Sequence, residues 1–255
     1  MKINQQKYTA IILLGGKGAR MGSLTKKNPK SLLKINKFTI LSHIYTQLRL
    51  IDISKIVFCL GYKKQKIIDY CTKQLNKDSD KILKILKKKK NYFKPNIYFS
   101  ILTENNSTSE RLYKAKRFSK DQNVIVLYGD TLLKLDIKKY KSYLMYKPNF
   151  DILLTLSNPK EKFGVAKLNK QRVISFSEKN IDKKKWVNSG WMIITSKVFN
   201  KIKKKSANFE NYIFDQTKKL KILAFKNKNF YLPIDNAKDL IQAEECWKKN
   251  KKTWY

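Results

Sequence analysis

Apolar and polar positions in the first half of the chain follow two alternating periods. Short runs rich in β-branched and aromatic residues, typical of strands, precede stretches in which apolar residues recur every three or four positions, typical of amphipathic helices. Strands are predicted at residues 8–14, 55–60, 96–102 and 123–127, and helices at residues 40–50, 64–74 and 109–118. This alternation indicates βαβ units, and therefore an α/β fold with a mixed, mainly parallel central sheet flanked by helices.

The second half of the chain has a more mixed pattern. It predicts strands at residues 151–156, 164–168, 173–177, 190–195 and 230–233, and helices at residues 197–204, 209–220 and 237–248. The Lys-rich segment 76–95 is weakly patterned, and we interpret it as an inserted helix or loop. No internal repeat, hexapeptide β-helix pattern or Pro- or Ser-rich linker is found. We therefore expect one domain over residues 1–255, without a C-terminal β-helix domain.

Composition favours a folded protein, because 42% of the 255 residues are hydrophobic and 12% are aromatic. The 57 basic and 19 acidic residues give a formal net charge of +38, which first suggests a nucleic-acid-binding protein. However, only five of the basic residues are Arg, and the Lys residues are spread along the whole chain. Because base and phosphate recognition favours the bidentate Arg fork, we interpret most of this charge as compositional bias that attracts small polyanions rather than a specific nucleic acid.

The apolar runs and the cysteines indicate the cellular compartment of the protein. The apolar run near the N-terminus, residues 10–14, is far shorter than a bilayer span or a signal peptide, so no membrane partner is expected. Cys59, Cys71 and Cys246 are odd in number and lack CxxC spacing. They fit neither a disulfide framework nor a zinc site, and they indicate the reducing cytoplasm.

A glycine-rich loop directly follows the first predicted strand. Gly15, Gly16 and Gly18 allow close backbone approach, and their N–H groups can bind phosphate oxygens, although such a sequence also fits a plain tight turn. The spacing matches neither the dinucleotide-binding motif nor the P-loop. Arg20 and Lys30 follow in the same loop. Two cations near one polyphosphate could stabilise a pyrophosphate leaving group, so we predict catalytic roles for both.

Motifs along the rest of the chain extend this picture. The glycine loop with Arg20-Met21 and the Pro29-Lys30 pair resembles the signature of the nucleotidylyltransferases that activate sugar 1-phosphates. Further matching motifs follow in the same order: Leu60-Gly61-Tyr62-Lys63, Tyr128-Gly129-Asp130, Phe163-Gly164-Val165, Phe176 to Lys179, Trp186 to Trp191, and Leu232 to Asp235. The similarity covers about residue 8 to the end, and within the family it is greatest to the glucose-1-phosphate cytidylyltransferase group.

The resemblance implies a nucleotide-diphospho-sugar transferase fold, which is Rossmann-like, and a reaction. A sugar 1-phosphate attacks the α-phosphate of a nucleoside triphosphate, most simply CTP, and pyrophosphate leaves; the cofactor is Mg²⁺. Asp130 ends a predicted strand, where open α/β sheets bind ligands, and fits as one metal ligand. Asp235 fits as the other by resemblance, although alone Asp235 or Asn236 would be interpreted as the N-cap of the following helix. The family also implies a homo-oligomer.

The resemblance further implies the residues that contact each substrate. Those expected to bind the nucleotide are Leu14, Gly15, Gly16, Gly18, Arg20, Lys30, Thr108, Arg111 and Gly129. Those expected to bind the sugar phosphate are Glu178, Lys179, Asn188 and Gly190. Without the resemblance, the Glu178-Lys179 pair fits an exposed surface pair, and residues 188–190 fit an ordinary turn.

Two departures from the family pattern affect the nucleotide site. Ser109-Glu110 replaces a Gly-Gly pair before Arg111, and Ala19 replaces a Thr in the first loop. The base and the sugar therefore stay open: the same chemistry with another nucleoside triphosphate or another phosphorylated substrate is the alternative within the enzyme class. A Lys-rich nucleic-acid-binding protein, or a protein that binds nucleotide without turnover, is the alternative outside it. His43, on a predicted helix, has no nucleophile partner motif and is interpreted as structural.

Overall fold

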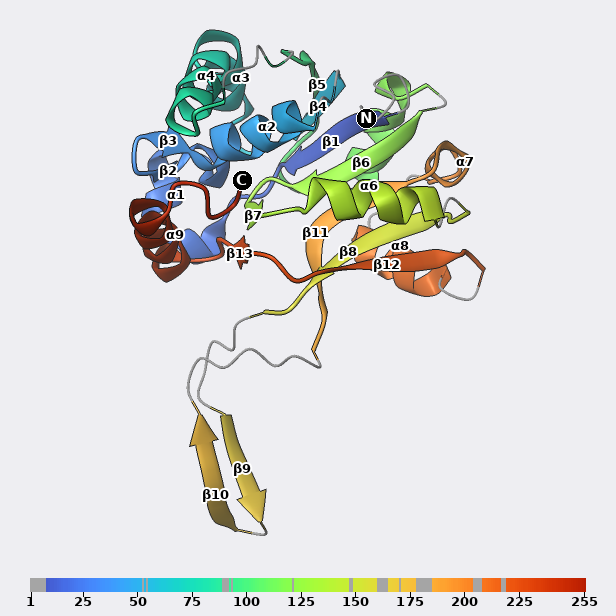
Figure 1. Ribbon diagram of the computed structural model, residues 1–255. Helices are drawn as coiled ribbons and strands as arrows, with labels where there is room; N and C mark the ends of the chain where they lie inside the picture. Colours follow the sequence, from blue (N-terminus) through green and yellow to red (C-terminus); the bar gives the residue numbers. More distant parts are fainter. Residues whose placement is uncertain are drawn as a thin grey trace.

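The structure is a computed structural model, and it describes residues 8–255 except 52, 54, 89–91, 93, 121, 147–148, 160–164, 170, 178–184, 204–207 and 217–218. Its centre is a seven-stranded sheet with the strand order β12-β8-β11-β6-β1-β4-β5 (Figure 1). The strands are β1 (Tyr8–Leu14), β4 (Lys55–Leu60), β5 (Asn96–Ile101), β6 (Asn123–Tyr128), β8 (Ile152–Ser157), β11 (Val187–Ile194) and β12 (Ile222–Asn227). Strand β11 is antiparallel to both neighbours, and the other neighbouring strands are parallel.

Helices cover both faces of this sheet (Figure 1). They are α1 (Leu24–Lys27), α2 (Ile40–Leu50), α3 (Lys64–Lys73), α4 (Leu75–Ile85), α5 (Thr108–Ala115), α6 (Ile137–Tyr146), α7 (Ser196–Phe199), α8 (Phe209–Gln216) and α9 (Ala237–Lys249). Successive side chains of a strand point to opposite faces. Accordingly, Ala10 and Ile12 of β1 belong to a core cluster with α2, α4 and α9, whereas Ile11 and Leu13 belong to one with α5, α7 and α8.

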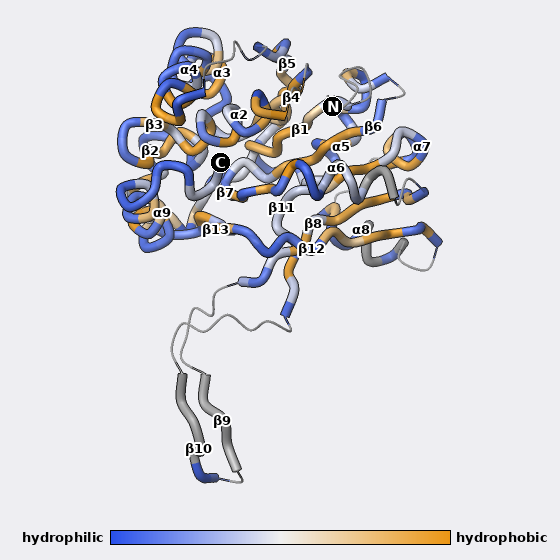
Figure 2. The backbone as a smooth tube through the Cα atoms, viewed as in Figure 1, coloured by the Kyte–Doolittle hydropathy of each residue, from blue (hydrophilic) through white to orange (hydrophobic). Residues whose placement is uncertain are grey.

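The distribution of hydropathy follows these layers. The strands of the central sheet are largely hydrophobic, and the outer turns and helix surfaces are largely hydrophilic (Figure 2). Strand β1 is buried from Thr9 to Leu14, as a central parallel strand between two helical layers should be. The many Lys residues therefore surround an ordinary α/β core.

Three short strand pairs accompany the main sheet. They are β2 (Lys34–Ile35) with β3 (Phe38–Thr39), β7 (Thr131–Leu133) with β13 (Tyr231–Pro233), and β9 (Val165–Asn169) with β10 (Arg172–Ser177). The pair β7–β13 joins two segments that are a hundred residues apart in the chain, and it positions residues of the site described below.

The predicted fold class is confirmed, and most predicted elements lie within a few residues of the observed ones. Six of the observed α-helices and strands were not predicted: α1, β2, β3, β7, α6 and the edge strand β12. Strand β12 has partly exposed side chains and two polar residues at its end, so its apolar alternation is weak. The Lys-rich segment 76–95 contains most of α4, which packs on α2 and buries Leu75 and Ile82. No helix in the described part of the chain is long and apolar enough to cross a bilayer.

The C-terminal segment closes one end of the core around His43. This side chain is fully buried in α2, its ring centroid lies 4.9 Å from that of Trp247 and 5.3 Å from that of Trp254, and its Nδ1 lies 2.8 Å from the Tyr255 hydroxyl oxygen. Burial lowers the pKa of His43 to about 3. This histidine is therefore a neutral core residue at physiological pH.

Candidate active site

The predicted site residues gather at the edge of the sheet where the parallel strands end. Gly15 follows β1, Gly61 follows β4, and Gly129-Asp130 follows β6, and these three strands are neighbours in the sheet. The carboxyl ends of neighbouring parallel strands meet at one edge, and open α/β folds bind ligands there. The polar residues that follow these strands therefore line the same edge.

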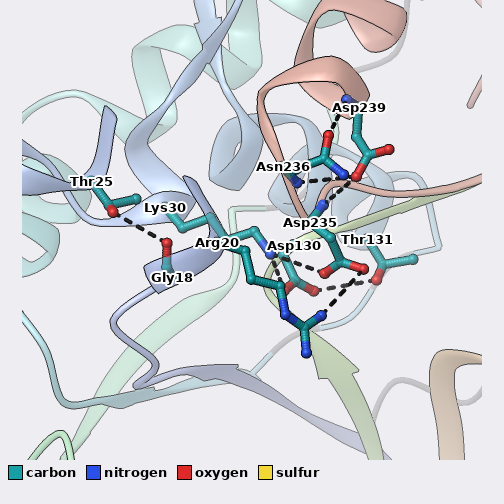
Figure 3. Close-up of polar contacts among 9 residues, drawn as sticks. All are labelled: Gly18, Arg20, Thr25, Lys30, Asp130, Thr131, Asp235, Asn236 and Asp239. Atoms are coloured by element: carbon teal, nitrogen blue, oxygen red, sulfur yellow. Dashed lines mark hydrogen bonds and ion pairs between the residues drawn. The ribbon is translucent and has the colours of Figure 1, made fainter. Parts of the chain in front are cut away.

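Gly15 and Gly16, neighbours in the glycine loop, have different surroundings. A Cβ added at Gly15 would lie 1.9 Å from the Arg111 Cζ atom, whereas one at Gly16 would meet no atom within 4 Å. Gly18 has a φ of 65°, which a glycine adopts readily, and Thr25 Oγ1 donates a hydrogen bond to its carbonyl oxygen at 3.2 Å (Figure 3). Of the three glycines that directly follow β1, Gly16 is thus the one with open space beside its backbone.

Two carboxylates share one ammonium group beside this loop. Lys30 Nζ lies 2.8 Å from Asp130 Oδ2 and 3.4 Å from Asp235 Oδ1 (Figure 3). Arg20 reaches the same group from solvent, with an Nη1 to Asp235 Oδ2 distance of 4.0 Å and a side chain that is 82% exposed. The Lys30 side chain is only 13% exposed. The structure therefore brings together the two predicted catalytic cations and the two predicted metal ligands.

Backbone pairing fixes the two aspartates. Strands β7 and β13 pair antiparallel, and beyond them the Ile234 N–H donates to the Asp130 carbonyl oxygen at 2.9 Å. Asp130 and Asp235 consequently leave adjacent ends of one small sheet. The β7–β13 register thus sets the separation of their backbones, and Lys30 contacts both carboxylates from the glycine loop.

The start of helix α9 decides between two roles for Asp235. Asn236 is the N-cap: its Oδ1 accepts from the Asp239 N–H at 3.1 Å, and Asp239 Oδ2 accepts from the Asn236 N–H at 3.1 Å, which completes a capping box. Asp239 Oδ2 also accepts from the Asp235 N–H at 2.8 Å. The Asp235 carboxylate is therefore not used as a cap, and it points toward Lys30 (Figure 3).

The oxygen donors at this point fit a hard divalent cation. Among the described residues, no group of three or more His, Cys, Asp or Glu side chains could enclose a metal ion. A pair of carboxylates is nonetheless what Mg²⁺ uses when phosphate oxygens and water complete its shell. Burial, with smaller contributions from the carboxylates of Asp235 and Asp130, raises the pKa of the nearby Tyr231 hydroxyl to about 12.

Arg111 lies beneath the loop that follows β1. Its guanidinium is buried and donates to the carbonyl oxygens of Leu60 at 2.8 Å and Thr103 at 2.7 Å, with longer contacts to the carbonyls of Gly15 and Glu104. Gly15 and Gly61 both leave space for this group, since a Cβ at Gly61 would lie 2.8 Å from Nη2. Arg111 thus ties together the carboxyl ends of β1, β4 and β5.

The residues before Arg111 account for the departure from the family Gly-Gly. Glu110 belongs to the capping box of α5: its Oε2 accepts from the Ser107 N–H at 2.8 Å, and its own N–H donates to Ser107 Oγ at 3.2 Å. Ser109 is buried, and Thr108 Oγ1 accepts from the Phe209 N–H at 2.7 Å. The Glu110 side chain therefore stabilises the start of α5, and the Thr108 hydroxyl satisfies the first N–H of α8.

The predicted sugar side of the site is described in part. Asn188 Oδ1 accepts from the Gly190 N–H at 3.0 Å, and Gly190, with a φ of 71°, lies against Tyr128, since an added Cβ would be 2.9 Å from its Cδ2 atom. Gly190 therefore lies beside the end of β6, and Asn188 pairs with Leu156 of β8. Glu178 and Lys179 lie outside the described residues.

Gly129 and Leu14 are packed against each other. A Cβ at Gly129 would lie 2.0 Å from Leu14 Cδ2, and the Gly129 N–H donates to the Leu13 carbonyl oxygen at 3.1 Å. The glycine allows β1 and β6 to end side by side. Asp130 then emerges directly beside the glycine loop.

One contact at this edge was not predicted from the sequence. Lys17 Nζ in the glycine loop lies 2.9 Å from Glu104 Oε1 in the segment after β5. Both side chains are partly exposed, at 55% and 38%, so the pair contributes little to stability. No local sequence signal joins residues so far apart in the chain, and only the neighbouring positions of β1, β4 and β5 bring them together.

This edge defines a class of protein, the α/β enzymes that bind a polyphosphate at a glycine-rich loop with cations and carboxylates around it. The comparison with protein families gives the family itself: the chain belongs to the nucleotidyl transferase family, whose model matches residues 9–251. It is therefore a nucleotidyltransferase, and the resemblance indicated by the sequence motifs is confirmed.

Individual relatives differ in their substrates. The chain is 26% identical over 253 residues to glucose-1-phosphate cytidylyltransferase of Salmonella typhimurium, covering 96% of this chain and 98% of the relative. It is 28% identical over 232 residues to D-glycero-alpha-D-manno-heptose 1-phosphate guanylyltransferase of Campylobacter jejuni, covering 90% and 96%. Among solved structures, HddC from Yersinia pseudotuberculosis matches with a TM-score of 0.69 at 22% identity, covering 94% of this chain and 99% of that one. The similarity to the HddC structure supports the α/β fold described above.

Proposed function

We propose that this enzyme transfers CMP from CTP to a hexose 1-phosphate similar to glucose 1-phosphate and releases pyrophosphate. The observation that carries the proposal is the group formed by Lys30, Asp130 and Asp235 beside the open backbone at Gly16. The motif resemblance and the Salmonella typhimurium relative support the choice of base and sugar. The CDP-sugar product suits surface-polysaccharide or lipopolysaccharide and deoxysugar biosynthesis in the cytoplasm.

The reaction is a direct displacement at the α-phosphorus. An oxygen of the sugar 1-phosphate forms a bond to the α-phosphorus of the nucleotide, the bond from that phosphorus to the oxygen bridging toward the β-phosphorus breaks, and pyrophosphate leaves with the electron pair. Catalysis of this kind depends on positioning and charge neutralisation. Arg20 and Lys30 supply positive charge to the leaving pyrophosphate, and the Gly16 backbone binds the phosphate chain.

Asp130 and Asp235 would hold Mg²⁺ through their carboxylate oxygens. A bound Mg²⁺ supplies charge neutralisation at the phosphate oxygens and orients them for in-line attack. The carboxylates themselves are positioned by the β7–β13 pairing and by the separate N-cap at Asn236. Neither aspartate is needed as a proton acceptor, because the attacking phosphate oxygen is already ionised.

The remaining predicted residues divide between the two substrates. Thr108, Arg111 and Gly129, with Leu14 and the glycine loop, form the side assigned to the nucleotide. Asn188 and Gly190 would contact the sugar phosphate together with Glu178 and Lys179. A homo-oligomer, as the family resemblance implies, is part of the same proposal, and size-exclusion chromatography with light scattering would test it.

The alternative function is the same chemistry with another nucleotide or another sugar phosphate. The guanylyltransferase relative is as similar to this chain as the cytidylyltransferase, and Ser109 and Glu110 stand where the cytidylyltransferase pattern has two glycines. Pyrophosphate release measured with each of four nucleoside triphosphates, in combination with several sugar 1-phosphates, separates these functions. Turnover with GTP, UTP or dTTP but not with CTP would exclude the first proposal and support the alternative.

A further inference from the structure

Lys30 is the main counter-ion of the carboxylate pair. Its ammonium contacts Asp130 Oδ2 at 2.8 Å and Asp235 Oδ1 at 3.4 Å, and its side chain is 13% exposed (Figure 3). Arg20 is 4.0 Å from Asp235 and 82% exposed, so solvent screens its charge. Lys30 is therefore the less exposed of the two cations, and its ammonium contacts both carboxylates.

The backbones of the two aspartates are held next to each other. Asp130 is fixed through its carbonyl, which accepts from Ile234 N–H at 2.9 Å, and Asp235 through its own N–H on Asp239 at 2.8 Å. Two like charges held close together favour a cation between them. Because Lys30 already contacts one oxygen of each carboxylate and its positive charge repels a divalent ion, the two cations compete for the position between the carboxylates.

We infer that Lys30 occupies the metal position before the substrates bind and exchanges its partners when they arrive. This inference rests on the proposed metal role of Asp130 and Asp235. In the empty enzyme Lys30 neutralises the carboxylates; in the loaded enzyme its flexible four-carbon stem moves the ammonium onto the phosphate oxygens of the nucleotide. Lys30 is then both the counter-ion of the empty site and a phosphate ligand of the loaded one.

The exchange couples the binding of metal and nucleotide. A metal ion alone must displace an ammonium group that gains no new anionic partner, so it binds weakly. With a nucleoside triphosphate present, the displaced ammonium finds phosphate oxygens, so the metal binds more tightly. Because such coupling is reciprocal, the metal raises nucleotide affinity by the same factor.

Direct binding of Mn²⁺, which prefers the same oxygen ligands as Mg²⁺, tests the exchange without any turnover. Free Mn²⁺ is measured by electron paramagnetic resonance, with and without CTP, for the wild-type protein, Lys30→Met and the control Lys34→Met. Lys34 is exposed in β2 and its replacement makes the same change in net charge. Without nucleotide, we expect Lys30→Met to bind Mn²⁺ at least about tenfold more tightly than the other two proteins, within the usual range of coupling effects.

Addition of CTP gives the second readout. It should tighten Mn²⁺ binding in the wild-type protein and in Lys34→Met, and much less in Lys30→Met. Thermal unfolding without metal should show a lower midpoint for Lys30→Met than for Lys34→Met, and Mn²⁺ should restore it, because the unpaired carboxylates then regain a cation.

Two results would overturn the inference, and they differ in what else they affect. If Lys30→Met binds Mn²⁺ no more tightly than Lys34→Met while Asp130→Asn weakens binding, the metal site stands but Lys30 does not compete for it. If Mn²⁺ binding is unaffected by Asp130→Asn and Asp235→Asn, with or without CTP, the proposed metal ligands are wrong. The proposed exchange of Lys30 partners is then wrong as well.

Discussion

Gly15 and Gly16 are neighbours in the glycine loop, and the structure predicts opposite consequences when each is replaced by alanine. The added Cβ at Gly15 would lie 1.9 Å from Cζ, 2.1 Å from Nη1 and 2.3 Å from Nη2 of Arg111. At Gly16 the same Cβ would meet nothing within 4 Å. Replacement of glycine by alanine lowers the entropy of the unfolded chain equally at both positions. The difference between the two variants therefore measures the clash with Arg111.

The magnitude follows from the bonds that the guanidinium must give up. Displacement of Arg111 breaks its two shortest hydrogen bonds, to the carbonyls of Leu60 at 2.8 Å and Thr103 at 2.7 Å. Hydrogen bonds to charged groups contribute about 1.5 kcal/mol or more each, so we expect Gly15→Ala to lower the free energy of unfolding by about 3 kcal/mol. Gly16→Ala should change it by less than about 0.5 kcal/mol, as substitutions away from such contacts do.

Urea unfolding of the two variants measures this difference, and nucleotide binding measures its functional counterpart. Gly16→Ala should weaken CTP binding without loss of stability, because its Cβ would enter the space open to a phosphate. A third protein, Gly15→Ala combined with Arg111→Met, should be less destabilised than the sum of the two single changes. Equal stability of Gly15→Ala and Gly16→Ala would refute the assigned position of Arg111.

Three further predictions concern other parts of the molecule. Asn236→Ala removes the N-cap of α9 and should cost about 1 kcal/mol of unfolding free energy in urea; a loss near zero would contradict the capping box. The pKa of His43 is lowered to about 3 in the folded protein, whereas in the unfolded chain His43 binds a proton near pH 6.5. The free energy of unfolding should therefore fall by about 2 kcal/mol between pH 7 and pH 5. His43→Asn should show a smaller decrease over that range. Nucleic-acid binding, measured in a salt titration, should be weak and unspecific, because the Lys excess is spread over the chain; tight binding to one sequence would favour the nucleic-acid alternative.

Sequence periodicity predicts the sheet well because its central strands are buried on both faces. Strand β1 is a short run, apolar except at Thr9 and followed by glycines, and its observed bounds equal the predicted ones. The edge strand β12 has exposed alternate side chains and lacks that signal. Its position is set by pairing with β8, which is a tertiary contact that local patterns do not encode.

For the site, the motifs indicate which residues matter, and the fold determines how they are arranged. From sequence alone Asp235 fits the N-cap of the next helix as well as a metal ligand, and only the Asn236 capping box separates the two roles. Likewise the motif pattern marks Arg111 but does not reveal that Gly15 and Gly61 make room for it. Such relationships depend on strand neighbours rather than on spacing along the chain.

The proposed reacting centre of the nucleotidyl transfer consists of Asp130, Asp235 and Lys30. It is tested most directly by pyrophosphate release from CTP and glucose 1-phosphate in the presence of Mg²⁺, compared between the wild-type protein and Asp130→Asn. We predict release that requires all three components and falls at least on the order of a hundredfold in the variant, which should remain folded. Equal rates in the two proteins, or no release with any pair of nucleotide and sugar phosphate, would contradict it.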